Sequence, residues 1–337
     1  ASLAAAKVGA RPHAKTHKSA DIARLQLAAG AVGVCAAKLG EAETLFAEGI
    51  QKICMTTANL SKAKIQRAMN LRKKNREFIQ AVDYPQNAQD LSDAAKAAGI
   101  TADVVVDVAI GTRSGVPADK ALALAQLIDK LPNLKFRGML AYDGSAQHIK
   151  GYKARLEQSL ERSADAARTF ERMKASGLNA EIFSGGGTGT YNIMPKVPGY
   201  TDVQVGSYVF MDAQYLEIGN EKGDIFTDFA PSLTVMTTVL NTYFPNRITT
   251  DAGTKALTLN KPDPIVLGEP GFRYTAGSDE FGTIQYETAN KTYKVGDKLE
   301  LIIPHCDPVV NEYDVFYCVR NDKVEAVWPV TARGKSQ

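Results

Sequence analysis

The feature that most constrains the fold is an alternation of short β-rich runs with helical stretches over residues 1–228. The strand-like runs are expected at 11–15, 32–36, 52–57, 77–82, 103–109, 135–142, 180–184 and 202–205. Strands that alternate with helices are typical of a parallel sheet. Eight such units of roughly 25 to 30 residues each favour a closed α/β barrel, a (β/α)8 TIM-like barrel, over an open doubly wound sheet. Spacing alone leaves the open sheet as an alternative.

The character of the sequence changes after about Asp228. Strand-like runs follow at 233–240, 291–295, 298–303 and 315–319. Turn signals such as Gly268-Glu-Pro270 separate these runs, and no helical repeat accompanies them. We therefore predict two domains, which are the barrel over residues 1–228 and a C-terminal antiparallel β domain over residues 229–337.

Composition narrows the class of protein further. The 337 residues are 45% hydrophobic, which is enough to bury a sizeable core, and the net charge is only +3. The longest basic run, Arg72-Lys73-Lys74, is too short for a nucleic-acid surface. No run approaches the roughly 18 apolar residues of a membrane span. The sequence therefore predicts neither a nucleic-acid partner nor a membrane partner.

The compartment is harder to predict than the class. Four cysteines show no framework spacing, so we expect reduced thiols and a cytoplasmic location. The chain opens inside an alanine-rich helical stretch without an initiator methionine. We therefore expect an upstream segment, and targeting cannot be predicted without it.

The first expected strand carries an unusual density of basic groups. On an extended strand, alternation would place four of them on one face: Arg11, His13, Lys15 and His17. Buried cations need a neutralising partner, which a phosphate-bearing ligand would supply. Lys15 lies at the carboxyl end of the strand, where barrel enzymes place catalytic groups. Cationic neighbours would also lower the pKa of a lysine that forms a Schiff base. The alternative is an exposed basic strand end.

Two glycine-containing loops follow the seventh and eighth expected strands. They are Gly185-Gly-Gly-Thr-Gly-Thr190 and Gly206-Ser-Tyr208. Glycine lets backbone N–H groups approach an anion closely, and these two loops form the usual phosphate site of a (β/α)8 barrel. The residues predicted to hold a phosphate are Thr188, Gly189, Gly206, Ser207 and Tyr208. Either loop alone is equally well explained as a simple turn.

Three further candidates follow the fifth and sixth strands. Arg113 lies on a glycine-flanked loop and suits a bidentate contact with a carboxylate or cofactor oxygen. Tyr142 is placed to line a cofactor ring, and His148 is a candidate catalytic base. The ordinary alternatives are a surface arginine and a core aromatic residue.

In the β domain, the sequence His305-Cys306-Asp307 is the main candidate for a metal site. On an extended segment, His305 and Asp307 would point to one side and Cys306 to the other. An imidazole nitrogen and a carboxylate oxygen suit Zn²⁺ or Mn²⁺ and leave positions for water or substrate. The spacing by itself is weak evidence.

Taken together, these motifs resemble the fold-type III pyridoxal-phosphate (PLP) enzymes of the D-threonine aldolase and D-serine dehydratase group. The matching segments, in chain order, are 11–18, 142–148, 185–191, 206–212, 251–253, 305–307 and 332–335. The resemblance implies an alanine-racemase-like barrel with a β domain, a homodimer and a small D-amino-acid substrate. It also implies that Lys15 holds PLP as a Schiff base, that the glycine loops hold its phosphate, and that His305 and Asp307 hold a divalent metal (Mn, Zn or Mg).

The second of the two metal-binding residues differs between the aldolases and the dehydratases of this group. Dehydratases tend to present His-X-Cys and aldolases His-X-Asp, so Asp307 favours an aldolase. Such a carbon–carbon lyase would cleave β-hydroxy-D-amino acids similar to D-threonine into glycine and an aldehyde. The alternatives are a dehydratase of D-serine or 3-hydroxy-D-aspartate (a carbon–oxygen lyase), a PLP-binding protein without turnover, and a racemase. Phe281 stands where relatives often carry histidine, which puts polar support near the metal in doubt.

Overall fold

The computed structural model describes residues 2–111 and 114–337, which form two compact units. The barrel unit comprises Ala1–Ile149, Lys153–Gly206 and Val315–Gln337. The β unit comprises Lys150–Tyr152 and Ser207–Asp314. Among the described residues, no helix has the length and apolar character needed to cross a membrane.

The barrel unit is built on eight parallel strands. They are β1 (Gly9–Ala10), β2 (Val34–Ala36), β3 (Ile53–Met55), β4 (Ile79–Val82), β5 (Ala102–Asp107), β6 (Leu134–Ala141), β7 (Ile182–Gly185) and β8 (Asp202–Val203). Their order in the sheet is β1-β8-β7-β6-β5-β4-β3-β2. The circle is closed beyond β1, where His13 forms a parallel bridge to Cys35 and the Ala14 N–H donates to the Cys35 carbonyl at 2.8 Å. The barrel architecture is therefore confirmed.

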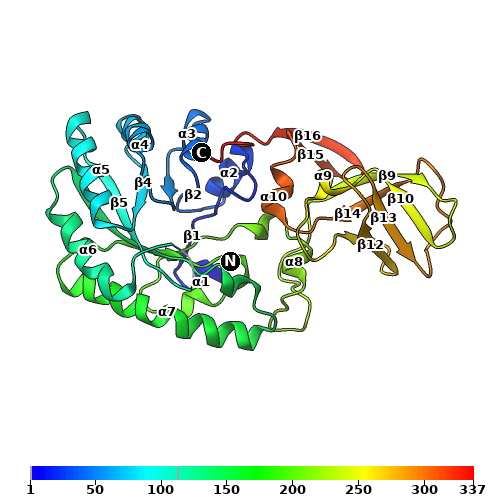
Figure 1. Ribbon diagram of the computed structural model, residues 1–337. Coiled ribbons are helices and arrows are strands. Elements are labelled where there is room, and N and C mark those ends of the chain that lie inside the picture. Colours follow the sequence, from blue (N-terminus) through cyan, green and yellow to red (C-terminus); the bar gives the residue numbers. More distant parts are fainter. Residues whose placement is uncertain (1, 112–113) are drawn as a thin grey trace. The chain divides into compact units, whose positions relative to one another are not determined.

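Helices follow the strands and surround them. They are α1 (Ser2–Ala5), α2 (Ala20–Ala28), α3 (Leu39–Ala47), α4 (Lys62–Lys74), α5 (Pro85–Ala98), α6 (Ala118–Lys130) and α7 (Tyr152–Ala175). Figure 1 shows α3 to α7 succeeding one another around the outside of the strands. A strand covered in this way can be buried along its whole length, as in β5, where all six residues are buried. Inside, Cys35 and Cys54 are free thiols in a core cluster with Val105 and Leu140.

The first strand differs from its prediction. The strand expected at 11–15 ends early. β1 is Gly9–Ala10, parallel pairing continues as far as His13, and residues 14–17 form a turn. The Lys18 N–H donates to the Ala14 carbonyl at 2.7 Å, and Lys18 itself has a left-handed φ of 50°. Strand alternation therefore stops after His13, and the shared face predicted for the four basic residues does not extend to Lys15 and His17.

The β unit carries a six-stranded antiparallel sheet. Its strands are β9 (Thr234–Asn241), β10 (Arg247–Thr250), β11 (Ile265–Val266), β12 (Phe272–Ala276), β13 (Gly282–Tyr286) and β14 (Lys298–Ile302), in the order β11-β14-β9-β10-β13-β12. Three short α-helices of the described chain belong to the same unit, namely α8 (Ala213–Leu216), α9 (Thr254–Leu257) and α10 (Cys306–Val310). The antiparallel β domain is confirmed, although the run 291–295 is not a strand.

The C-terminal segment joins the barrel unit. Strands β15 (Val315–Arg320) and β16 (Lys323–Pro329) form a separate antiparallel pair. Beyond them, the Ala332 N–H donates to the Lys18 carbonyl at 2.8 Å, directly after the first turn of the barrel. Contacts therefore group residues 315–337 with the barrel, whereas the sequence analysis placed all of 229–337 in the second domain; the boundary at 228 remains a prediction.

Candidate active site

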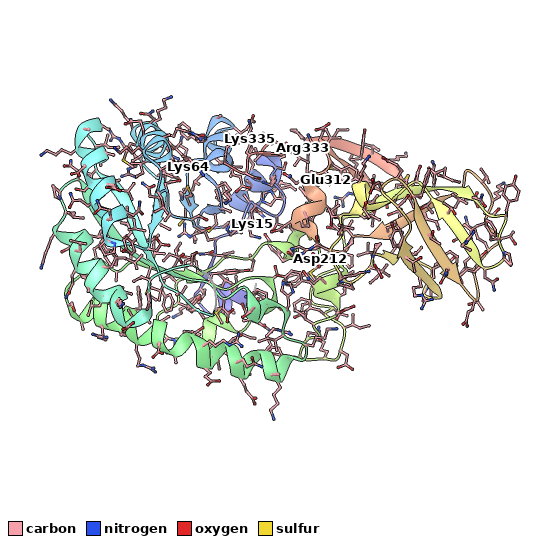
Figure 2. All side chains as sticks on the ribbon, in the orientation of Figure 1. Lys15, Lys64, Asp212, Glu312, Arg333 and Lys335 are labelled. Atoms are coloured by element: carbon pink, nitrogen blue, oxygen red, sulfur yellow. The ribbon has the colours of Figure 1, made fainter. Side chains whose placement is uncertain are left out.

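Lys15 occupies the turn that follows the first barrel strand (Figure 2). Lys15 is partly exposed, whereas its neighbours Ala14 and Thr16 are buried. Its backbone N–H donates to His13 Nδ1 at 3.5 Å, and His13 Nε2 lies 3.2 Å from Thr56 Oγ1. His13 therefore supports the backbone of the turn, and the lysine side chain projects from a turn that the protein holds in place.

Arg11 is neutralised by the protein itself. Its guanidinium makes a two-pronged contact with Asp202, with Nε to Oδ1 at 2.9 Å and Nη2 to Oδ2 at 3.2 Å. Burial is the largest single influence and lowers the pKa of Arg11. The charge and hydrogen bond of Asp202, with smaller contributions from Cys54 and Cys35, together outweigh burial and hold that pKa above its ordinary value. The expectation that a phosphate-bearing ligand neutralises this group is therefore wrong for Arg11. Sequence reasoning missed Asp202, which lies 191 residues away.

The other basic residues of the motif are also engaged. His17 Nε2 lies 3.2 Å from Gln26 Oε1, while His17 Nδ1 accepts the Ser19 N–H at 3.1 Å. Lys18 Nζ forms a buried ion pair with Glu41, whose second carboxylate oxygen accepts the Ala37 N–H. Each of these side chains serves to fix the segment on either side of Lys15.

The loop after β8 lies against the Lys15 turn. The His13 N–H donates to the Val205 carbonyl at 2.8 Å, which aligns the two segments. A Cβ on Gly206 would lie 2.6 Å from Thr16 Oγ1, so only glycine lets the backbone approach this closely. The structure thus brings Gly206 and the lysine turn together, and Ser207 and Tyr208 follow directly in the chain.

The glycine loop after β7 is shaped by Gln147, a residue to which the sequence analysis gave no role. Gln147 is buried, and its side-chain carbonyl accepts the Gly189 N–H at 3.1 Å. A Cβ on Gly189 would lie 2.3 Å from the Gln147 backbone oxygen, and one on Gly187 would lie 2.7 Å from Gln147 Oε1. Glycine is therefore required at both positions, because the loop backbone packs directly against Gln147. The predicted Thr188 lies between them and is buried.

A second unpredicted residue fixes this loop from behind. Arg155 on α7 is completely buried. Its Nε donates to the Gly189 carbonyl and its Nη1 to the Ile149 carbonyl, both at 2.7 Å. An arginine in a long helix carries no sequence signal for such a role, because the contact depends on how the helix packs.

The remaining barrel candidates are placed differently. Tyr142 is partly exposed at the glycine loop, where a Cβ on Gly187 would lie 3.5 Å from its Cε2 atom. His148 is exposed at the end of the short 3-10 helix η1 (Ser145–His148). Arg113 lies outside the described residues.

In the β unit, the predicted metal ligands lie at the start of α10. His305 is the N-cap residue in extended conformation, and Asp307 is in the first helical turn. The argument from an extended segment is therefore wrong, because strand alternation stops at His305. Cys306 is buried with Sγ 3.0 Å from Asp212 Oδ2, and burial raises the pKa of its thiol. A neutral thiol engaged in this way leaves His305 and Asp307 as the candidate donors.

These donors fit a metal site in which protein supplies only part of the coordination sphere. Within the two described stretches, no group of three or more His, Cys, Asp or Glu side chains is arranged to hold a metal ion. His305 Nδ1 lies 3.0 Å from Asp212 Oδ2, so a metal ion bound by this ring would be held through the opposite nitrogen, Nε2. Asp212 was not predicted as a site residue.

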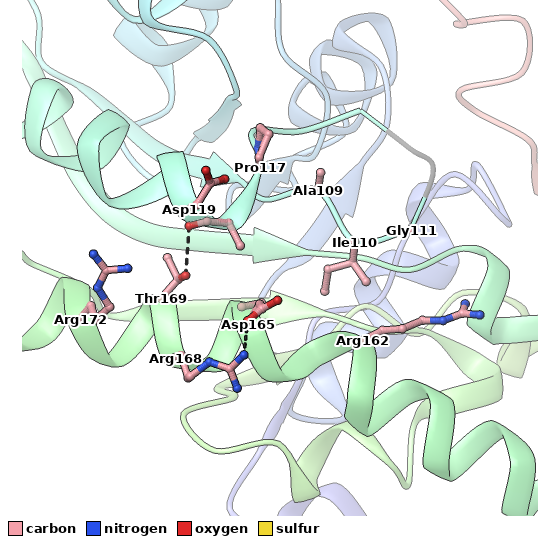
Figure 3. Close-up of a pocket in the computed structure, with 12 residues that line it drawn as sticks. Ala109, Ile110, Gly111, Pro117, Asp119, Arg162, Asp165, Arg168, Thr169 and Arg172 are labelled. Carbon is pink, nitrogen blue, oxygen red and sulfur yellow. Dashed lines mark hydrogen bonds and ion pairs between the residues drawn. The ribbon is translucent and has the colours of Figure 1, made fainter.

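One cavity is described in the barrel unit, at a different place (Figure 3). It measures about 670 Å³ and lies between the segment Ala109–Gly111, the start of α6 and the middle of α7. Two of its arginines are engaged with carboxylates, Arg162 with Asp143 and Arg168 with Asp165. None of the described residues predicted for cofactor, metal or catalysis lines it.

Comparisons with known proteins cover almost the whole chain. The family described as "Alanine racemase, N-terminal domain" matches residues 3–214, and the family described as "Putative serine dehydratase domain" matches residues 232–319. A 3-hydroxy-D-aspartate aldolase of Paracoccus denitrificans (strain Pd 1222) is 38% identical over 96% of this chain and 85% of its own length. A D-threonine aldolase of Arthrobacter sp. is 37% identical over 98% of this chain and 86% of its own length.

Solved structures give the same picture. The crystal structure of a D-threonine aldolase from Filomicrobium marinum matches with a TM-score of 0.93 and 34% identity, covering 99% of this chain and 90% of that one. A D-threo-3-hydroxyaspartate dehydratase from Delftia sp. HT23 matches with a TM-score of 0.84 and 25% identity, covering 97% and 91%. The aldolases are thus more similar to this chain than the dehydratase is.

Proposed function

This chain belongs to the fold-type III PLP enzymes of the D-threonine aldolase and D-serine dehydratase group, and we propose that it is an aldolase. As a carbon–carbon lyase, it would cleave β-hydroxy-D-amino acids into glycine and an aldehyde. The named relatives act on D-threonine or 3-hydroxy-D-aspartate, which sets the two substrates to examine first.

The observation that carries this proposal is the position of Lys15. Its turn lies at the carboxyl end of the barrel strands, and Gly206 of the loop after β8 lies against the same turn. Barrel enzymes assemble their active sites at this end, with phosphate held by the loops after strands 7 and 8. The two glycine segments support this reading because they follow β7 and β8, and glycine lets them approach Gln147 and Thr16 closely.

Each residue of the barrel site then has a separate task. The Lys15 amine would hold PLP covalently. Thr188, Gly189, Gly206, Ser207 and Tyr208 would hold its phosphate. Tyr142 would pack beside the cofactor ring, Arg113 would contact a carboxylate or cofactor oxygen, and His148 would accept the proton of the substrate hydroxyl. When bound, PLP supplies an electron sink for the bond that breaks.

In the β unit, His305 and Asp307 would hold a divalent cation (Mn²⁺, Zn²⁺ or Mg²⁺). One nitrogen and one oxygen donor suit these ions when water completes the coordination sphere. The chemistry that such an ion supplies is polarisation of a hydroxyl group, which makes its proton easier to remove. We also propose that the enzyme is a homodimer, as the family resemblance implies, which light scattering of the purified protein would test.

The activity is tested by identifying products. The PLP-loaded protein with Mn²⁺ is incubated separately with D-threonine, 3-hydroxy-D-aspartate and D-serine. We expect glycine with acetaldehyde from the first substrate or glycine with glyoxylate from the second, and loss of both reactions with a chelator. Ammonia with oxaloacetate from 3-hydroxy-D-aspartate, or ammonia with pyruvate from D-serine, would instead support the dehydratase alternative.

A further inference from the structure

A buried carboxylate lies directly behind the predicted metal ligand in the β unit. Asp212 is completely buried, and its Oδ2 atom lies 3.0 Å from His305 Nδ1. The same oxygen accepts the Cys306 N–H at 2.9 Å and faces Cys306 Sγ at 3.0 Å. The other oxygen, Oδ1, accepts the Tyr215 N–H at 2.8 Å and caps the short helix α8 (Ala213–Leu216).

The backbone fixes this carboxylate in place. Immediately after Asp212, the Ala213 N–H donates to the Ile303 carbonyl at 2.9 Å and the Gln214 N–H to the Pro304 carbonyl at 3.2 Å. These bonds align the segment at 212 with the residues just before His305. Figure 2 shows Asp212 where α8 and α10 approach each other. Met211, the preceding residue, has a left-handed φ of 52°, which persists in a non-glycine residue only when its surroundings hold it there.

An ionised carboxylate only accepts hydrogen bonds, so the His305–Asp212 contact requires the proton on Nδ1. The Nε2 nitrogen then carries a lone pair and is the one that can bind a cation. Asp212 Oδ2 is surrounded by three donor groups of His305 and Cys306, which argues against Asp212 as a ligand in its own right.

We propose that Asp212 is a positioning residue for the metal: it orients the His305 ring and fixes the tautomer that presents Nε2. This inference rests on the proposed metal site at His305 and Asp307 and adds the residue that prepares it. Carboxylates behind metal-binding histidines act in this way in general, and their loss typically costs about 10- to 100-fold in metal affinity.

Asp212→Ser is the variant that separates positioning from capping. Serine is a good N-cap residue and retains an oxygen for the Tyr215 N–H, but it is too short to reach His305. We expect the PLP-loaded D212S protein to bind Mn²⁺ about 10- to 100-fold more weakly than wild type in a calorimetric titration. Asp212→Asn keeps an acceptor without the charge, so its loss should be smaller. Glu269→Gln is the matched control, because Glu269 is a buried carboxylate of the same unit that accepts from Asn290 and Tyr293.

The tautomer itself provides a readout that is independent of activity. The chain has only four histidines, so the ¹⁵N signals of His305 can be identified as those lost in His305→Gln. In the metal-free wild-type protein, we expect the proton on Nδ1. A proton on Nε2, or Mn²⁺ affinity within twofold of wild type in D212S, would overturn the proposal. If D212S does not fold, the wild-type tautomer decides the question.

The same titrations separate this inference from the proposed function. If H305Q binds Mn²⁺ as tightly as wild type, His305 is not a metal ligand, and the proposed role of Asp212 is contradicted as well. If H305Q loses Mn²⁺ binding while D212S keeps it, the metal site stands and only the positioning role is wrong. Loss in both, with E269Q unchanged, is the expected result.

Discussion

Arg11 and Lys15 are only four residues apart in one basic motif, yet they occupy different surroundings. Arg11 is 9% exposed and is held between two oxygens of Asp202 inside the barrel. Lys15 lies in the turn beyond the strand, partly exposed and beside Gly206. In the interior the chain supplies its own counter-charge, because an unpaired buried cation is costly. At the rim, glycine at 206 lets the loop after β8 lie against the Lys15 turn. We therefore expect the same residue class to serve stability at Arg11 and chemistry at Lys15.

The largest effect should come from the rim. Lys15→Ala should lower aldol cleavage by roughly a thousandfold or more, because the amine that holds the cofactor is gone. Its free energy of unfolding, measured in urea without cofactor, should change by less than about 0.5 kcal/mol, since the side chain is partly exposed. Lys96→Ala, at an exposed position of α5, is the control and should retain activity. Full activity in K15A would contradict a catalytic role for Lys15.

The interior should behave in the opposite way. Arg11→Met leaves Asp202 buried without its cation and should lower the free energy of unfolding by about 3–5 kcal/mol. Activity per folded molecule should change little, because Arg11 contacts Asp202 and not the ligand site. Arg11→Met combined with Asp202→Leu should recover part of the stability. A stable R11M protein that fails to bind PLP would show that Arg11 takes part in cofactor binding instead.

The glycine loop offers an intermediate test at the rim. Gly189→Ala places a Cβ 2.3 Å from the Gln147 backbone oxygen, so the loop must shift, at a cost of about 1–3 kcal/mol. We expect PLP affinity, measured by equilibrium dialysis, to fall about 10-fold or more. Gly223→Ala is the control, because no atom lies within 4 Å of a Cβ there and its φ is not left-handed. Equal PLP affinity in both variants would contradict a phosphate role for this loop.

The smallest effect concerns Asp83, a partly exposed carboxylate that follows β4. Burial raises the pKa of Asp83. An acid whose pKa is higher in the folded state than in the unfolded state destabilises the fold at every pH above those pKa values. Asp83→Asn should therefore raise the free energy of unfolding at pH 7, by less than about 1 kcal/mol because water reaches the carboxylate. The gain should vanish below about pH 4, where the carboxyl group is protonated in both states. A gain of the same size at pH 7 and at pH 3 would contradict this account.

The barrel could be predicted because strand and helix periodicity is local, and Lys15 could be placed at its rim for the same reason. The turn around Lys15 could not be predicted, because residues 14–17 contain no glycine or asparagine to indicate a turn. Lys18 also takes a left-handed φ although it is neither glycine nor asparagine. Asp202 and Asp212 were missed since their partners lie 191 and 93 residues away in the chain. Their roles depend on packing that periodicity does not describe.

The central claim is that the amine of Lys15, and no other amine of the motif, holds the cofactor. Borohydride reduction of the PLP-loaded protein, followed by peptide mass mapping, locates the lysine to which the cofactor is attached. We predict the pyridoxyl mass on Lys15 alone. A label on Lys18, which is paired with Glu41, or on any lysine outside residues 11–18 would contradict the account.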